Sequence, residues 1–248
     1  MGFDEGVPEG HSIHHCAAVH AATFGGQRVR VSSPQGRFPD ASLVDGQVLT
    51  GTDAWGKHLF HEYDNGLVVH VHLGIYGSFT RHDLPAPDPR PTTRMRMVGA
   101  DAAVDLVGPI TCEMLEDIEP IVAKLGPDPL RRDADPEQAW ERLRRRRIPI
   151  GQALLDQTVI AGVGNVYRAE ALFTHRIHPL RPANELTHDE FLAVWQTLVK
   201  LLRKGVRDMR IATRNVYRRD ACPECGTAIL RWDLAGRWAY ACPVCQPR

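Results

Sequence analysis

Two pairs of cysteines near the end of the chain have the spacing of a metal site. Cys222 and Cys225 form one C-x2-C pair, Cys242 and Cys245 form the other, and sixteen residues separate the pairs. Four thiolates with this spacing bind zinc tetrahedrally. Because four protein ligands leave no open coordination position, we expect one structural zinc ion rather than a catalytic one.

At the other end of the chain, Pro8 is followed directly by Glu9. A proline at a free amino terminus is a secondary amine that can attack a sugar aldehyde carbon and form an iminium, whereas a proline inside a chain is an unreactive amide. Seven residues precede Pro8 in the sequence. Whether the working chain begins at Met1 or at Pro8 therefore decides whether this residue can act as a nucleophile.

A third segment, Gly162-Val-Gly164-Asn165, precedes a predicted helix. No strand comes before it and no third glycine follows in register, so a dinucleotide-binding turn is disfavoured. The glycines could aim backbone N–H groups and the Asn165 amide at a DNA phosphate, or they could simply turn the chain. The spacing alone leaves both interpretations open.

Composition indicates a folded protein of one to three domains, with 248 residues and 43% hydrophobic content. Thirty basic and thirty acidic residues give no net charge, but residues 203–248 hold ten basic and four acidic ones. Such segregation is typical of a surface that faces phosphates. The chain has no apolar leader and no run of roughly 18 apolar residues. We therefore expect no membrane association and a cytoplasmic protein, associated with the nucleoid if it is bacterial.

The elements that must position these residues change in type along the chain. Apolar spacing and a Gly25-Gly26 stop predict a helix over 12–24. Short alternating runs then predict the strands of a β-sandwich. These strands are expected over 28–32, 43–50, 58–63, 67–73, 76–80, 95–98 and 103–106.

After residue 126 the pattern becomes helical. Helices are expected over 136–147, 152–157, 166–174 and 187–207, the last with a capping-box pattern at Thr187 and Glu190. Two strands, over 229–232 and 238–241, should join through a turn at Ala235-Gly236 between the cysteine pairs. A segment this small needs a metal to hold its fold.

Seven patches, taken together, resemble the formamidopyrimidine-DNA glycosylase / endonuclease VIII family. Their order and spacing match that family from Pro8 to Gln246. The patches are Pro8-Glu-Gly10, Trp55-Gly-Lys57, His72-Leu-Gly-Ile-Tyr-Gly77, Leu125-Gly-Pro-Asp-Pro-Leu130, Leu154-Leu-Asp-Gln157, Gly162-Val-Gly-Asn165 and the four-cysteine tail.

The resemblance implies an α+β fold in three parts. Residues 8–125 would form the catalytic β-sandwich domain with its flanking helix, and 126–213 a helical DNA-binding domain of the helix, two turns, helix type. Residues 214–248 would form the zinc-finger hairpin. Residues 1–7 are then interpreted as a non-native or misassigned leader, since Val7 stands where an initiator residue should precede Pro8.

The resemblance also implies a base excision repair enzyme that acts as a monomer on double-stranded DNA containing oxidised bases or abasic sites. Such an enzyme is both a DNA glycosylase and an AP lyase, and it extrudes the target base before removing it. By resemblance, the nitrogen of Pro8 attacks the sugar C1′. The resulting iminium allows β- and then δ-elimination, which cuts the strand.

Other site residues follow from the same resemblance. Glu9 matches the acid that protonates the departing group, and Lys57 matches a lysine that contacts phosphate and assists catalysis. Asn165 and Arg237 match the groups that grip the phosphates around the lesion, with Arg237 also linked to elimination, and His72 adds a backbone contact. From their spacing alone, Lys57 could be a solvated lysine and Arg237 a solvated hairpin residue.

Ile75 and Tyr76 occupy the position of the wedge that fills the space left by the extruded base. They could instead be strand residues of the core. Because neighbouring strand residues point to opposite faces, we expect only one of the two to enter the DNA cleft.

Some positions depart from the family pattern. Ser12 stands where relatives carry a second acid, and Gly151 where many carry a lysine. No Arg-x-Phe wedge precedes Gly108, which favours the endonuclease VIII branch and oxidised pyrimidines. The stretch 209–215 is shorter than the loop that many members of the family have at this place. A non-catalytic protein that binds damaged or abasic DNA is the alternative, should residues 1–7 cap Pro8.

Overall fold

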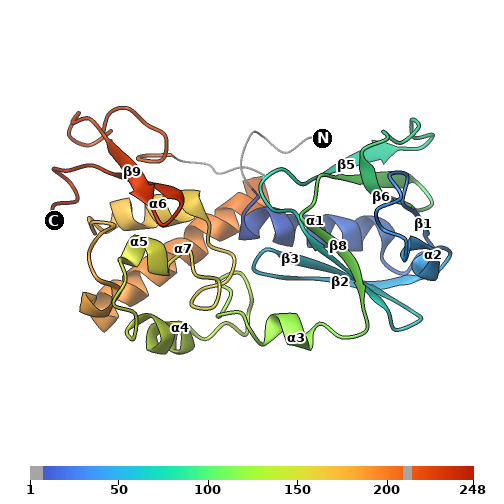
Figure 1. Cartoon of the computed structure of the whole chain (residues 1–248), viewed down its shortest axis with the longest axis horizontal. Coiled ribbons are helices and arrows are strands. Elements are labelled where there is room, and N and C mark those ends of the chain that lie inside the picture. The colour runs from blue at the N-terminus through green and yellow to red at the C-terminus, as the bar shows by residue number, and fades with distance from the viewer. Residues whose placement is uncertain (1–7, 209–213) are drawn as a thin grey trace. The chain divides into compact units, whose positions relative to one another are not determined.

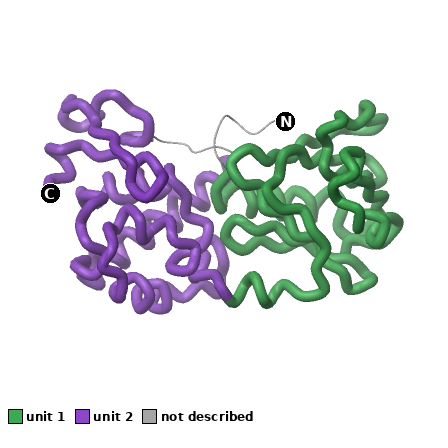
Figure 2. Tube along the Cα trace, viewed as in Figure 1, with its two compact units in different colours: residues 1–123 green, residues 124–248 purple. Residues whose placement is uncertain are grey.

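A computed structural model describes residues 8–208 and 214–248 of the chain. The predicted leader, residues 1–7, and residues 209–213 of the short loop lie outside the described residues. The chain divides into two compact units, unit 1 over residues 1–123 and unit 2 over residues 124–248 (Figure 2). Among the described residues, no helix has both the length and the apolar character that a membrane span requires.

Unit 1 begins with helix α1, Gly10–Phe24. It starts two residues before the predicted Ser12 and ends where predicted, at Gly25, whose N–H donates to the Ala21 carbonyl. The helix buries an apolar stripe that includes Ile13 and Phe24. Pro8 and Glu9 precede its first turn directly, with Glu9 as the extended N-cap residue.

Two four-stranded antiparallel sheets form the rest of unit 1 (Figure 1). One sheet has the order β1-β6-β7-β5 and the other has the order β2-β3-β4-β8. The first consists of β1 Arg30–Ser32, β6 Thr93–Val98, β7 Ala102–Val107 and β5 Ser78–Asp83. The second consists of β2 Leu49–Trp55, β3 His58–Tyr63, β4 Val68–His72 and β8 Thr111–Leu115. A single hydrophobic core takes residues from both sheets and from α1, which confirms the predicted β-sandwich.

The strand predicted over 43–50 is wrong in its first half. Residues Ala41–Val44 form the short helix α2, and β2 begins only at Leu49. This single helical turn buries Ala41 and Val44, three residues apart, and it is too short for its apolar spacing to be distinguished from that of a strand. Strand β8 and the short helix α3, Glu119–Val122, were not predicted.

Unit 2 is helical up to residue 208. Its elements are α4 Pro136–Leu143, α5 Ile150–Ala153, α6 Asn165–Thr174, the 3-10 turn η1 Ala183–Glu185 and α7 His188–Asp208. The capping box of α7 is confirmed, since Thr187 Oγ1 accepts from the Glu190 N–H at 3.2 Å and Glu190 Oε2 accepts from the Thr187 N–H at 2.8 Å. A core that includes Leu172, Phe191 and Leu198 joins α6 to α7.

Two helices of unit 2 end earlier than predicted. Helix α4 stops at Leu143 rather than at 147, with Arg144 as its C-cap residue. Helix α5 stops at Ala153 rather than at 157. There Asp156 Oδ1 accepts from the Thr158 N–H at 2.9 Å, a local side-chain bond that competes with helix continuation.

The end of the chain forms a hairpin of β9, Leu230–Leu234, and β10, Arg237–Ala241. The pairing of Leu234 with Arg237 leaves Ala235 and Gly236 as a two-residue turn, as predicted. Both turn residues have positive φ, 54° and 76°, which is the type I′ geometry that suits a twisted hairpin. A third core packs this segment against α6 through Phe173, Val216 and Tyr240.

Candidate active site and DNA interface

The predicted nucleophile and acid lie together at the start of α1. Pro8 is partly buried, and the Glu9 side chain is 1% exposed. The Glu9 carbonyl accepts from the Ser12 N–H at 2.9 Å, which fixes the first turn of the helix. Burial lowers the pKa of the neighbouring His11 to about 4, with a smaller contribution from His15. The carboxyl of Glu9 is therefore enclosed by protein at the start of α1.

Lys57 lies in the tight turn between β2 and β3. The pairing of Trp55 with His58 makes Gly56 and Lys57 the two turn residues. Gly56 has φ 60°, a conformation that glycine adopts without strain, and the first-position glycine is the mark of a type II′ hairpin turn. A two-residue turn leaves the backbone little freedom, so it directs the lysine from a fixed position.

His72 ends β4, and its ring is fixed by the loop that follows. The Gly74 N–H donates to His72 Nδ1 at 3.1 Å. An imidazole nitrogen that accepts a hydrogen bond carries no proton, so neutral His72 has its proton on Nε2. Burial and the charge of Lys57 both lower the pKa of His72, which favours this neutral form.

Ile75 and Tyr76 lie in the loop after β4, not in the core. Their exposed fractions are 41% and 87%. The interpretation of both as core strand residues is therefore wrong, because β5 begins only at Ser78. Strand alternation, the reason to expect only one of them in the DNA cleft, does not apply to these two loop residues. Ile110, 73% exposed, lies beside this loop, and a Cβ on Gly74 would come within 3.1 Å of the Ile110 Cβ. The sequence analysis did not single out Ile110. Its place directly after Gly108-Pro109 could have indicated an apolar side chain in an exposed loop.

In unit 2, Asn165 is the first residue of α6 and contacts the hairpin. Its Nδ2 donates to the Trp238 carbonyl at 3.1 Å. Arg168, 1% exposed, donates from Nη2 both to Asn165 Oδ1 and, at 2.7 Å, to the same Trp238 carbonyl. This arrangement joins the residue predicted to grip phosphate to the strand that begins with Arg237.

The glycine segment before Asn165 is held by the side chain of Gln157. The Gln157 amide donates to the Val163 carbonyl at 3.0 Å, and Gln157 Oε1 accepts from the Gly162 N–H at 2.9 Å. Gly162 has φ 85°. A side-chain clamp across a positive-φ turn fixes the entry of the chain into α6.

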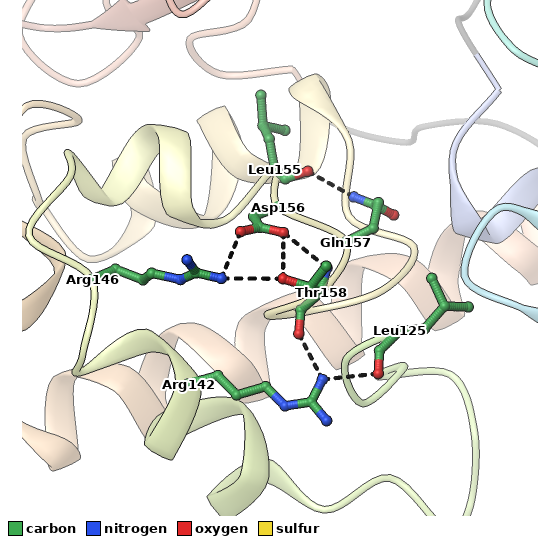
Figure 3. A network of polar contacts seen from close by, with 7 residues as sticks. All are labelled: Leu125, Arg142, Arg146, Leu155, Asp156, Gln157 and Thr158. Carbon is green, nitrogen blue, oxygen red and sulfur yellow. Dashed lines mark hydrogen bonds and ion pairs between the residues drawn. The ribbon is translucent and has the colours of Figure 1, made fainter. Parts of the chain in front are cut away.

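Two arginines, one in α4 and one just after it, hold the loop that carries Gln157 (Figure 3). Arg142 donates to the Leu125 carbonyl at 2.9 Å and to the Thr158 carbonyl at 2.7 Å. Arg146 pairs with Asp156 at 3.1 Å. The loop is thus attached to α4 on one side and, through Gln157, to the start of α6 on the other.

Arg237 is the exposed first residue of β10, directly before Trp238, whose side chain is 55% exposed. Its place is set by the two-residue turn and by the bonds of Asn165 and Arg168 to the next carbonyl. The hairpin therefore presents a cation and an aromatic ring side by side in sequence, a combination that suits nucleic acid.

The four cysteines converge as predicted. All four Sγ atoms lie within 4.8 Å of one another, and three of the separations are 3.4, 3.6 and 3.7 Å. Zn–S bonds of about 2.3 Å in a tetrahedron place sulfur atoms roughly 3.8 Å apart. The residues therefore fit a zinc ion, which would fasten the hairpin that carries Arg237.

The comparisons with known proteins decide the family. The sequence model of the formamidopyrimidine-DNA glycosylase N-terminal domain matches residues 7–107, and that of the H2TH domain of the same glycosylase matches residues 125–216. The chain belongs to the formamidopyrimidine-DNA glycosylase family. It is a DNA glycosylase, and its curated relatives include both endonuclease 8 proteins and formamidopyrimidine-DNA glycosylases.

Among curated relatives of this glycosylase, Endonuclease 8 1 of Mycobacterium bovis is 49% identical, over 97% of this chain and 100% of that protein. Formamidopyrimidine-DNA glycosylase of Thermomicrobium roseum is 32% identical, over 77% of this chain and 79% of that protein. The crystal structure of the MutM (Fpg) protein from Thermus thermophilus has 28% identity and a TM-score of 0.82, over 96% of this chain and 98% of that chain. The fold of the glycosylase is thus shared along nearly its whole length.

Proposed function

We propose that this glycosylase removes oxidised pyrimidines from double-stranded DNA and then cuts the strand at the abasic site. The observation that carries the proposal is the 49% identity with Endonuclease 8 1, which extends over 97% of the chain. The Lactococcus lactis Fpg, 25% identical with a TM-score of 0.83 over 97% of this chain and 100% of that chain, is a complex with DNA containing an AP site. That complex supports abasic DNA as the class of ligand.

Pro8 and Glu9 would carry the chemistry in a chain whose amino terminus is Pro8. The nitrogen lone pair of Pro8 bonds to the sugar C1′ while the glycosidic bond breaks, and the base leaves with the electrons of that bond and a proton. Glu9, buried beside Pro8, is the proton donor. Displacement leaves Pro8 joined to C1′, which still carries the ring oxygen O4′. The nitrogen lone pair then breaks the C1′–O4′ bond, while the N–H proton of Pro8 passes through the Glu9 carboxylate to O4′. The iminium that results acidifies the neighbouring sugar hydrogens. Loss of those protons expels the 3′ phosphate by β-elimination and the 5′ phosphate by δ-elimination.

The remaining residues would hold the DNA. Lys57, Asn165 and Arg237 contact the phosphates around the lesion, and Arg237 also assists elimination. His72 adds a contact from the end of β4. Such contacts position the duplex without reading its sequence.

The exposed loop residues Ile75 and Tyr76 would fill the space left by the extruded base. Their apolar surface replaces the stacking that extrusion removes. One zinc ion on Cys222, Cys225, Cys242 and Cys245 would serve the fold alone, because four thiolates leave no open coordination position. In this proposal a single chain acts on the DNA as a monomer.

Borohydride trapping on abasic duplex DNA tests the nucleophile. Two preparations are compared, one whose amino terminus is verified as Pro8 and one that begins at Met1. We expect a covalent adduct and strand cleavage only from the first, because only a free proline amine forms an iminium. Duplexes with an oxidised pyrimidine or an oxidised purine, assayed in parallel, test base choice. A Pro8 preparation that binds abasic DNA but gives neither adduct nor cleavage would favour a non-catalytic damage-binding protein instead.

A further inference from the structure

Three histidines and a glutamate share one face of the β2-β3-β4-β8 sheet. His58 on β3 is paired with His72 on β4, and His70 on β4 is paired with Glu113 on β8. Directly paired residues of antiparallel strands project to the same face, and so do residues two apart. The residues next to them, Leu59 in β3 and Val71 in β4, belong to the core on the opposite face. None of the three, His58, His70 or Glu113, belongs to the predicted site.

Hydrogen bonds join Glu113, His70 and His58 across three strands, and this series of bonds is called the hydrogen-bond chain below. Glu113 Oε1 lies 2.9 Å from His70 Nδ1, and His70 Nε2 lies 2.8 Å from His58 Nδ1. The His70 side chain is 5% exposed, whereas the Glu113 side chain is 51% exposed. The chain therefore begins at the surface and passes through a buried imidazole to His58. The rings of His58 and His72 pack edge to face, with their centroids 4.9 Å apart.

The carboxylate fixes the direction of every bond in this chain. An ionised carboxylate only accepts hydrogen bonds, so His70 must donate from Nδ1. A neutral His70 then has an acceptor at Nε2, so His58 must donate from its own Nδ1. His58 is left with a lone pair on Nε2. His72 has the opposite arrangement, because the Gly74 N–H already donates to its Nδ1.

The electrostatic surroundings keep both rings near Lys57 uncharged. Burial is the main cause that lowers the pKa of His58, to about 3, and His72, His70 and Lys57 lower it further. Burial also lowers the pKa of His70, although the bond to Glu113 opposes this shift. The result is a lysine cation near one imidazole with an acceptor nitrogen and another with a donor N–H.

We propose that Glu113, His70 and His58 are positioning residues for Lys57 and His72. They fix His58 in one tautomer and one ring orientation, and His58 directly follows Lys57 in the turn and packs edge to face against His72. A neutral His58 protonated on Nε2 would lose the bond that it donates to His70, and with it the orientation of its ring beside Lys57 and His72. This inference rests on the proposed function, in which Lys57 and His72 contact the DNA.

Nitrogen NMR of the full-length, zinc-bound protein labelled with 15N-histidine tests the hydrogen-bond chain without any activity measurement. We expect His58 and His70 to be neutral and protonated on Nδ1, and His72 to be neutral and protonated on Nε2. A wild-type His58 protonated on Nε2 would overturn the proposal. Because this result does not depend on catalysis, it stands apart from any failure of the proposed function.

Substitution of Glu113, the carboxylate at the end of these hydrogen bonds, then tests the effect of the bonds on Lys57. Glu113→Leu removes the acceptor, so His70 and His58 should move their protons to Nε2. The single-turnover rate of abasic-strand cleavage by protein with a Pro8 terminus should fall by about tenfold, the size of effect seen when a histidine at a metal site loses the partner that fixes its tautomer. Glu113→Gln, which keeps an acceptor oxygen, should recover most of the rate and both Nδ1–H tautomers.

The matched control is Glu116→Leu, which removes an exposed carboxylate three residues further along the chain. In this variant, the tautomers of His58 and His70 and the cleavage rate should equal those of the wild type. A purely structural role for Glu113 would lower the melting temperature without moving the His58 proton. Unchanged tautomers in Glu113→Leu, or cleavage within about twofold of wild type once those tautomers have moved, would contradict the positioning role.

Discussion

The side-chain amide of Asn165 donates to the main-chain carbonyl of Trp238, 73 residues further along the chain, at 3.1 Å. A primary amide has two N–H donors. One of them is thus used to hold the zinc hairpin, and the other can serve a DNA phosphate. The bond makes the geometry of a residue on α6 depend on whether β10 is folded.

Removal of the proposed metal should therefore disturb Asn165 and Arg237, the two residues of unit 2 that we propose to contact phosphate. We expect chelation to weaken binding to abasic duplex DNA by at least about tenfold, because the hairpin loses its staple and Arg237 its fixed position. Fluorescence anisotropy against measured zinc content checks this, and added zinc should restore binding. Full DNA affinity in verified metal-free protein would contradict a role for the hairpin.

Tyr76→Ala should reduce base excision from duplex DNA by about tenfold with no loss of stability. The ring is 87% exposed, so its removal leaves no cavity. Stacking against a base, by contrast, is worth about 1–3 kcal/mol. Single-turnover excision and thermal melting measure the two effects. Leu43→Ala removes another exposed apolar side chain of unit 1, 50% exposed, and should leave excision unchanged. Equal losses in the two variants would argue against insertion of Tyr76.

Glu170→Gln should destabilise unit 2 by about 1–3 kcal/mol. The buried carboxylate accepts from the backbone N–H groups of Asn215, Val216 and Tyr217, at 2.7, 3.1 and 3.0 Å. An amide at the same place turns one acceptor into a donor and leaves at least one of these N–H groups unsatisfied. Denaturant unfolding measures the change. Glu224→Gln, at an exposed position of the same unit, is the control and should cost little.

Stability should fall as the pH drops below the ordinary histidine range. His20 and His61 are bonded to each other at 2.9 Å in the core, and burial lowers the pKa of both, that of His61 to about 4. The unfolded state takes up protons near pH 6.5, whereas the folded state resists them until about pH 4. Unfolding free energy should thus decrease between these two values. In His20→Leu/His61→Leu, denaturant unfolding at several pH values across this window should show a shallower decrease, and an identical slope would contradict this account.

The sequence predicted best those elements whose cause is local. Thr187 and Glu190, three residues apart, bond to each other's backbone N–H groups. The Cys222–Cys225 and Cys242–Cys245 pairs flank a two-residue turn with positive φ. Each of these signals lies within a few residues of the structure it produces. The strand predicted over 43–50 failed because a single helical turn leaves too short a pattern to distinguish the two periods.

The His58–His70–Glu113 chain shows what sequence could not provide. Alternating histidines at 70 and 72 were visible, but their partners come from β3 and β8, which are separated by up to 43 residues from the ring they bond. Only the register of the sheet brings them together. The same is true of Asn165 and Trp238, whose contact depends on the packing of α6 against the hairpin.

The turn at Ala235-Gly236 also limits how this protein can change over generations. Side chains along a strand alternate in direction, so a change in turn length that slips the pairing of β9 and β10 by one residue would turn Arg237 to the opposite face of β10. Such a protein would keep its four cysteines, yet it would present a different side chain at the proposed phosphate contact. We therefore expect the turn to vary only among residues that tolerate positive φ, such as glycine, asparagine and aspartate, and changes in its length to be removed by selection.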